Sequence, residues 1–178
     1  MTCNCNKNPI KLGVKRLYKD VQLPQYTHVG DACFDIRVYI GDNESFFTDG
    51  SIPLVEDGEK SVPHKQIYIR PSESYTFHTG LVFDIPKGYM LAVYPRSGLG
   101  IKHHITLSNS TGIIDSCYTD ELRVALFNEG KNGFLVNSGD RVAQGMLVPV
   151  PEVVIEEVDE VEVKSRGTNS GLGSSGVK

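Results

Sequence analysis

The stretch "YTFHTGLVFDIPKGYMLAVY", residues 75–94, decides the expected fold. Its short runs are rich in Val, Tyr and Phe and are bounded by Gly, Pro and Asp, which is typical of β-strands joined by turns. Comparable runs recur along the chain as "CFDIRVYI", "QIYIR", "ELRVALFN", "GFLV" and "RVAQGMLVPV". No stretch carries an apolar period of 3.6 residues over three turns. The sequence therefore predicts an all-β sandwich or barrel.

Length and charge limit the functional classes. The chain has 178 residues, enough for one domain with a core, and its formal net charge of −4 gives no broad basic surface for nucleic acid. Its apolar runs are short and broken by proline, so no transmembrane span is expected. The N-terminal "MTCNCNKNPIK" lacks the apolar core of a signal peptide, which predicts a cytoplasmic protein. Cys3 and Cys5 have no second Cys/His pair at zinc-ligand spacing, which favours reduced thiols.

Two segments differ from the strand-rich remainder. Residues 41–65 are polar and full of Gly, Pro and acids, and we interpret them as a long insertion between strands. After the acidic "PEVVIEEVDEVEV", the end of the chain is rich in glycine and serine, as expected of a mobile tail. We therefore predict a β-domain over residues 1–163, with an insertion at 41–65, and a flexible glycine-rich arm over residues 164–178.

Three glycine-containing motifs allow two interpretations each. "YPRSGLG", residues 94–100, can hold a phosphate through backbone N–H groups, a hydroxyl and a guanidinium, or can be an ordinary turn. "GDRVAQ", residues 139–144, offers Gln144 at the start of a strand, or merely a surface pair between Asp140 and Arg141. "RGTNSGLGSSG", residues 166–176, is either a linker or a lid led by an arginine that folds over a polyphosphate.

The fourth motif is "TGIIDSCYTDELRV", residues 111–124. Asp115 follows two isoleucines, and a carboxylate among apolar neighbours must be paired, hydrated or functional. Along one hairpin, Asn109, Gly112, Asp115 and Tyr118 could read a base edge and pack on a sugar. The alternative is a buried structural aspartate beside a core tyrosine.

In their order along the chain, "DACFDIRV", "YPRSGLG", "NSTGIIDSCY", "GDRVAQ" and "RGTNSGLGSSG" resemble the five motifs of the trimeric dUTP pyrophosphatase (dUTPase) family. The resemblance runs from about His28 to Gly176, with residues 41–65 as an insertion. It implies a homotrimer of distorted β-barrels of jelly-roll, β-clip-like form. Each active site would be shared between subunits, and the C-terminal arm would cross to close over one of them.

The resemblance also implies an activity. The protein would be a dUTP diphosphatase in which water attacks the α-phosphate of dUTP, with Mg²⁺ as cofactor, giving dUMP and pyrophosphate. This reaction would keep uracil out of DNA and supply dUMP for dTMP synthesis. No membrane and no direct nucleic-acid partner are expected. The location would be the cytoplasm, the host cytoplasm for a viral protein, or the nucleus for a eukaryotic one.

Residue roles follow from the same resemblance. Asp115 would be catalytic, as the carboxylate that activates water, and Asp35 would hold Mg²⁺ through water while the triphosphate supplies most of its ligands. The residues that would bind substrate are Arg96, Ser97, Gly98, Asn109, Gly112, Ile113, Ile114, Tyr118, Arg123, Gln144, Arg166, Leu172, Gly173 and Ser174.

One position departs from the family pattern, and two rival functions remain. Leu172 replaces the aromatic residue that usually stacks on uracil, which predicts a looser lid. A dCTP deaminase shares the fold but needs a glutamate where this chain has Ala125, and Glu121 is out of register for that role. The other rival is a non-catalytic β-module that binds a protein partner through residues 41–65.

Overall fold

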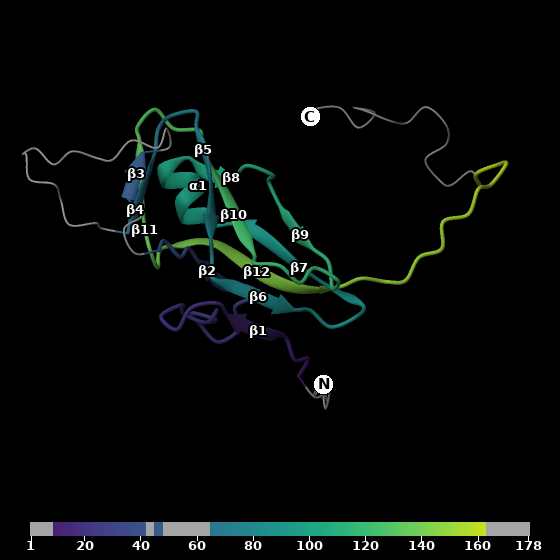
Figure 1. Ribbon diagram of the computed structural model, residues 1–178. Coiled ribbons are helices and arrows are strands. Elements are labelled where there is room, and N and C mark those ends of the chain that lie inside the picture. Colours follow the sequence, from purple (N-terminus) through teal and green to yellow (C-terminus); the bar gives the residue numbers. More distant parts are fainter. Residues whose placement is uncertain (1–8, 42–44, 48–64, 163–178) are drawn as a thin grey trace, which may run out of the picture.

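A computed structural model describes residues 9–41, 45–47 and 65–162. The all-β prediction is confirmed, since the described chain is built from short strands and one short helix (Figure 1). The elements are β1 (Gly13–Arg16), β2 (Phe34–Arg37), β3 (Ser45–Phe47), β4 (Gln66–Ile69), β5 (Ser74–His78), β6 (Leu81–Asp84), β7 (Tyr89–Pro95), α1 (Ser97–His103), β8 (Ile105–Leu107), β9 (Gly112–Ile114), β10 (Arg123–Asn128), β11 (Phe134–Asn137) and β12 (Arg141–Pro149).

The central sheet has the order β2-β12-β7-β9, and all its neighbours are antiparallel. β12 runs through the middle of the molecule and continues into residues 150–162, which extend away from the body (Figure 1). β2 and β9 form the two edges of this sheet. The position of a residue on β2, β12, β7 or β9 is therefore fixed by the register of the strands between the edges.

The remaining strands form separate sheets with the orders β5-β10-β8, β11-β4-β3 and β1-β6. β3, inside the expected insertion, pairs in parallel with β4. The expectation of a barrel is thus met only at the level of an all-β fold, because the described strands do not close into one hydrogen-bonded cylinder. The rest of residues 41–65, apart from Gly41 and Lys65, and the arm at 164–178 lie outside the described residues.

Alternation along the strands builds the core. In β10, Val124 and Leu126 are buried while the residues between them are not, as the period of a strand requires. β4 buries Ile67 and Ile69 in the same way. The fully buried side chains Phe77, Ile36, Leu91 and Val136 come from four different strands, so one core joins the sheets.

A close approach of backbone and ring anchors β12. A Cβ built on Gly145 would lie 2.7 Å from the ring of Phe34 in the neighbouring strand β2. Only glycine leaves room for this ring, which itself packs on Phe83. The contact holds β2 against β12 and so fixes the edge of the central sheet that carries Asp35.

Two local predictions were wrong. The ordinary turn considered for residues 94–100 is instead the end of β7 followed by the start of α1. His104 ends this helix with a left-handed φ of 56°, and Leu99 packs against the core. β9 does not form a hairpin with β10, because β9 pairs with β7 while β10 pairs with β5 and β8. No helix of the described chain is long and apolar enough to cross a membrane.

Candidate active site

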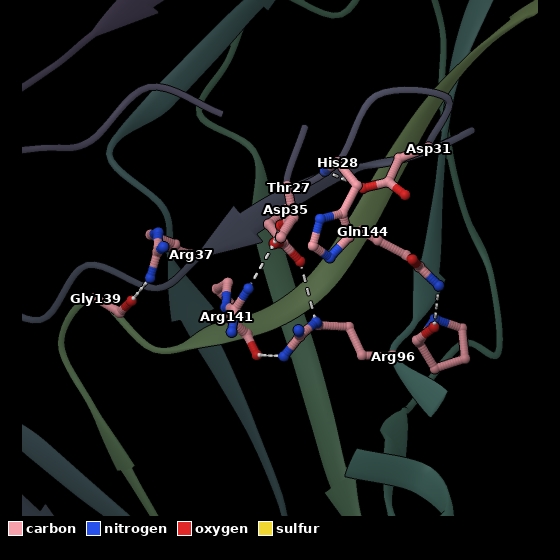
Figure 2. A network of polar contacts seen from close by, with 10 residues as sticks. Thr27, His28, Asp31, Asp35, Arg37, Arg96, Gly139, Arg141 and Gln144 are labelled. Atoms are coloured by element: carbon pink, nitrogen blue, oxygen red, sulfur yellow. Dashed lines mark hydrogen bonds and ion pairs between the residues drawn. The ribbon is translucent and has the colours of Figure 1, made fainter. Parts of the chain in front are cut away.

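Strand register brings three charged side chains to one cleft. Asp35 of β2 lies opposite Gln144 of β12, and Gln144 lies opposite Tyr94 of β7. Arg96 follows directly after β7, and Arg141 begins β12. The side chains of Asp35, Arg96 and Arg141 point toward one another from these three neighbouring strands (Figure 2).

Asp35 is the centre of this cluster. Its Oδ1 lies 3.1 Å from Nε of Arg96, and its Oδ2 lies 3.1 Å from an Nη of Arg141. The Thr27 hydroxyl donates a hydrogen bond of 2.9 Å to the same Oδ2. Arg96 also donates to the backbone oxygen of Arg141 at 2.9 Å. The carboxylate thus holds two guanidinium groups in fixed positions before any ligand binds (Figure 2).

The contacts of Asp35 decide its charge. Burial raises the pKa of the carboxyl, but hydrogen bonds from Thr27 and Arg141 and the charges of Arg96 and Arg141 outweigh that effect. The net pKa of Asp35 is lowered, so the group is ionised at neutral pH. In the same cleft, burial and then the charge of Asp31 raise the pKa of the Cys33 thiol, which keeps that thiol protonated.

The cleft has a volume of about 570 Å³ and includes the start of α1. Ser97 and Gly98 line it, and the first N–H groups of a helix have no partner inside the helix. The Gln144 amide donates 3.0 Å to the Pro95 oxygen, which orients its side chain at the rim. The residues that line the cleft are Thr27, His28, Asp31, Ala32, Cys33, Asp35, Arg96, Ser97, Gly98, Arg141 and Gln144.

This arrangement suits a phosphate chain together with a cation. Two guanidinium groups and free helix N–H groups are donors for phosphate oxygens. No group of three or more His, Cys, Asp or Glu side chains that could hold a metal occurs in the described residues. The carboxylates that line the cleft are Asp31 and Asp35, and both oxygens of Asp35 already face arginines. A Mg²⁺ ion here would therefore need water and substrate oxygens for most of its shell.

Asp115 lies in a different environment. It follows β9 in an exposed loop, and its backbone oxygen accepts the N–H of Tyr118 at 3.1 Å. Ile113 beside it is 62% exposed. The expectation of a carboxylate in an apolar setting was therefore wrong; of the three alternatives, hydration describes the carboxylate in a single chain.

The two aspartates are far apart within one chain. Asp35 lies on one edge strand of the central sheet and Asp115 just beyond the other, with β12 and β7 between them. Strand spacing puts the edges about 14 Å apart, and the register adds about 10 Å along the strands, because Ile114 pairs with Leu91 rather than near Tyr94. The backbones at Asp35 and Ile114 are thus about 17 Å apart, beyond the reach of an aspartate side chain.

The predicted site residues therefore fall into two groups. The first, which lines the cleft, is Asp35, Arg96, Ser97, Gly98 and Gln144. The second lies at or near β9, with Asn109 before it, Gly112, Ile113 and Ile114 within it, and Asp115 and Tyr118 after it. Arg123 begins β10, is exposed and lies opposite His78. The predicted residues Arg166, Leu172, Gly173 and Ser174 lie outside the described residues.

Sequence reasoning missed one arginine of the cleft. Arg141 was considered only as a surface partner of Asp140, but it binds Asp35, while Asp140 accepts the N–H of Asn137. A strict period of two would put residues 141 and 144 on opposite faces. A register shift between Arg141 and Ala143 changes the alternation, and both Arg141 and Gln144 line the cleft.

Comparisons with known proteins agree with the family resemblance of the sequence. A family model described as dUTPase matches residues 62–176. The deoxyuridine 5'-triphosphate nucleotidohydrolase of Gloeothece citriformis is 35% identical over 168 residues, which cover 94% of this chain and 98% of that protein. The protein of the same name from Clostridium kluyveri is 35% identical over 94% of this chain and 99% of its own length.

Solved structures show the same fold. The dUTPase of Staphylococcus bacteriophage 80alpha, determined with dUPNHPP, superposes with a TM-score of 0.72 at 25% identity and covers 94% of this chain and 99% of that chain. The dUTPase of phage phi11 of S. aureus, at 22% identity, has a TM-score of 0.66 and covers 86% and 99%. The second likeness supports the fold alone.

Proposed function

Because this chain belongs to the dUTPase family, we propose that it hydrolyses dUTP to dUMP and pyrophosphate in the cytoplasm. The proposal rests chiefly on one observation: Asp35, Arg96, Ser97, Gly98 and Gln144, from separate motifs of the sequence, line one cleft. In the cell this reaction would keep uracil out of DNA and provide dUMP for dTMP synthesis.

In the proposed reaction Asp115 orients a water molecule and accepts its proton. The water oxygen forms a bond to the α-phosphorus, the bond to the bridging oxygen breaks, and pyrophosphate leaves. Arg96 and, from the tail, Arg166 stabilise the negative charge that develops. Asp35 would hold Mg²⁺ through water, and the bound ion would neutralise phosphate oxygens. Ser97, Gly98 and Gln144 position the phosphate chain.

Recognition of the nucleoside is assigned to the second group of residues. β9 is an edge strand, so one side of its backbone is not used by β7 and is available to a uracil edge. Asn109 and the backbone at residues 112–114 would pair with uracil and reject cytosine by leaving polar groups unpaired. A close backbone would exclude the methyl group of thymine, and Tyr118 would exclude a ribose 2′-hydroxyl. Arg123 would lie beside the base.

We further propose that the enzyme is a homotrimer with shared sites. The separation of about 17 Å between Asp35 and the end of β9 supports it, because a second copy can supply what one chain cannot. The tail at residues 164–178 would close over a neighbouring site, with Arg166, Gly173 and Ser174 at the triphosphate and Leu172 over the base.

Mixing two variants of low activity tests this sharing. Asp115→Asn and Arg96→Ala chains, unfolded together and refolded, should recover dUTP hydrolysis, because about a quarter of randomly mixed sites combine one intact residue from each. Refolding each variant alone is the control. No recovery in the mixture, or full wild-type activity in a species with the mass of one chain, would refute shared sites.

Turnover of four nucleotides tests the activity itself. With Mg²⁺ present, pyrophosphate release should be fast with dUTP and slow with dCTP, dTTP and UTP. Release of ammonia from dCTP would instead identify a deaminase. If purified wild-type protein leaves dUTP intact, the proposed function is wrong.

A second role, binding of a protein partner through residues 41–65, is supported by one relative. The phage 80alpha dUTPase, 25% identical, belongs to a group described as controlling transfer of virulence genes. Deleting residues 48–64, which keeps β3 and its pairing with β4, should leave dUTP hydrolysis within about twofold of wild type, because the length of a connection has little effect on stability. A larger loss would place the insertion in the enzyme rather than in a partner interface.

A further inference from the structure

The carboxylate of Glu121 has no role in the proposed chemistry, yet it is held firmly. Its Oε1 accepts the backbone N–H of Gly80 at 2.7 Å, and its Oε2 lies 2.6 Å from Nδ1 of His78. The side chain is only 12% exposed. A solvated glutamate at the end of a loop would be mobile, so these contacts fix the position of residue 121.

The next residue is fixed to the same turn. The Thr79 hydroxyl donates a hydrogen bond of 2.6 Å to the backbone oxygen of Leu122. The Leu122 N–H donates one of 2.8 Å to the backbone oxygen of Leu81. Thr79 and Leu122 are 1% and 2% exposed, so water does not compete for these bonds. The loop after β9 therefore ends on the turn at residues 78–81, which joins β5 to β6.

This turn is held by contacts on both sides. Gly80 has a φ of 68°, and a Cβ added there would overlap Cγ2 of Val21. Its backbone oxygen accepts the N–H of Leu17 at 2.8 Å. A side chain at residue 80 would be strained there, and the backbone of Gly80 is hydrogen-bonded both to Leu17 and to Glu121.

Tyr118 is attached to the fixed end of the loop. Its hydroxyl donates a hydrogen bond of 3.0 Å to the backbone oxygen of Glu121, and its N–H donates one of 3.1 Å to the backbone oxygen of Asp115. The ring is 40% exposed, so part of its surface remains open to a ligand. The position of the Tyr118 ring therefore depends on the position of the Glu121 backbone oxygen, which the side-chain contacts of Glu121 help to fix.

We propose that Glu121, seated on the turn at residues 78–81, is a positioning residue that fixes the ring of Tyr118 and thereby sets the preference for deoxyribose over ribose. The proposal rests on the proposed function, in which Tyr118 packs on the sugar. Steric exclusion of a single hydroxyl requires a ring that cannot retreat, since a displacement of about 1 Å is enough to loosen a site.

The measurement is the ratio of kcat/KM for dUTP to kcat/KM for UTP. Glu121→Ala should lower this ratio on the order of tenfold, the lower end of what one group in a pocket contributes to selectivity. Glu121→Gln keeps an acceptor for the Gly80 N–H and should restore most of the ratio. Tyr118→Phe, which loses the bond to the Glu121 oxygen, should lower the ratio in the same direction.

Two comparisons separate positioning from stability. Ser138→Ala removes a similar side-chain acceptor, for the N–H of Ile40 at 3.0 Å, away from the cleft; it should lower the melting temperature without changing the ratio. The double variant Glu121→Ala/Tyr118→Phe should show less than the product of the single effects, because both act on one ring.

An unchanged dUTP/UTP ratio in Glu121→Ala overturns the proposal, whatever happens to the melting temperature. If Glu121→Ala does not fold, Tyr118→Phe decides in the same way, and an unchanged ratio there overturns the proposal too. A wild-type protein that hydrolyses no dUTP refutes the proposed function instead. The two failures are therefore distinguishable.

Discussion

Asp35 and Asp115, the two aspartates of the candidate site, differ in how much one chain does for them. Asp35 is gripped by two arginines and a threonine in a cleft. Asp115 stands exposed after an edge strand, and no hydrogen bond or ion pair of its carboxylate occurs among the described residues. The contacts of Asp35 thus come from within the chain, whereas Asp115 is exposed to solvent. One described chain therefore organises the Asp35 cleft but leaves Asp115 unorganised, which is the arrangement expected of a site shared between copies.

The largest expected effect is that of Asp115→Asn, which tests whether the exposed aspartate takes part in the reaction. We expect the rate of dUTP hydrolysis to fall by about 10²–10⁴, the usual contribution of a general base, with no loss of melting temperature because the side chain is exposed. Pyrophosphate release and thermal melting measure the two quantities. Asp120→Asn, an exposed acid in the same loop, is the matched control and should keep its rate. Full-speed turnover by Asp115→Asn would remove this residue from the mechanism.

Arg96→Ala tests the organised half. We expect kcat/KM for dUTP to fall by about 10–100-fold, since a charge-assisted hydrogen bond contributes about 1.5–3 kcal/mol. Arg96→Lys should give an intermediate value, because it keeps the charge but loses the second donor that now reaches the Arg141 oxygen. Equal values for the Ala and Lys variants would mean that the geometry of the guanidinium is unimportant.

Asp35→Asn tests whether the cleft is organised before substrate arrives. The lowered pKa of Asp35 lies below the unfolded value of about 3.9, so the ionised group stabilises the fold fully above about pH 4 and less as the pH falls through the folded-state pKa. At pH 7 the variant should lose about 1–2 kcal/mol of unfolding free energy.

Denaturant unfolding at pH 7 and at pH 3, at one protein concentration, measures this effect. The difference between wild type and Asp35→Asn should shrink at the lower pH. Asp84→Asn, on the strand β6, replaces a strand carboxylate outside the cleft and should show no comparable difference at pH 7. A gap that stays constant between the two pH values would contradict an ionic origin.

The smallest expected effect concerns residue 172 of the proposed lid. Leu172→Phe should lower the KM for dUTP about two- to tenfold with kcat retained, because an aromatic pair contributes about 0.5–1.5 kcal/mol beyond its buried area. Leu172→Ala should raise KM and serves as the opposite control. No change, or a rise, in Leu172→Phe would argue against stacking of residue 172 on the base.

Much of the fold could be predicted from local patterns. The runs that became β2, β4, β5, β6, β7, β10, β11 and β12 all alternate or are bounded by turn residues. α1 could not be found, since Gly98 and Gly100 are poor helix formers and packing of Leu99 outweighs their propensity. The pairing of β9 with β7 was also hidden, because a three-residue strand carries no signal for its partner.

Most residues of the candidate site could be predicted from motifs, but their separation into a cleft at Asp35 and a second group at β9 could not. Motifs indicated Asp35, Arg96 and Gln144, and strand register explains why they meet. The role of Arg141 depends on a register shift that no period reveals. Likewise, two isoleucines before Asp115 indicated an apolar setting, whereas alternation along the chain leaves Ile113 and, two residues on, Asp115 exposed to water.

Residues 150–162, which follow β12, affect the tendency of chains to aggregate. Exposed apolar side chains in this segment would favour aggregation between chains; they are Val153, Val154, Ile155, Val158 and Val161. Acidic residues are interspersed with these apolar side chains and oppose aggregation, because like charges repel when two such segments approach each other. They are Glu152, Glu156, Glu157, Asp159, Glu160 and Glu162.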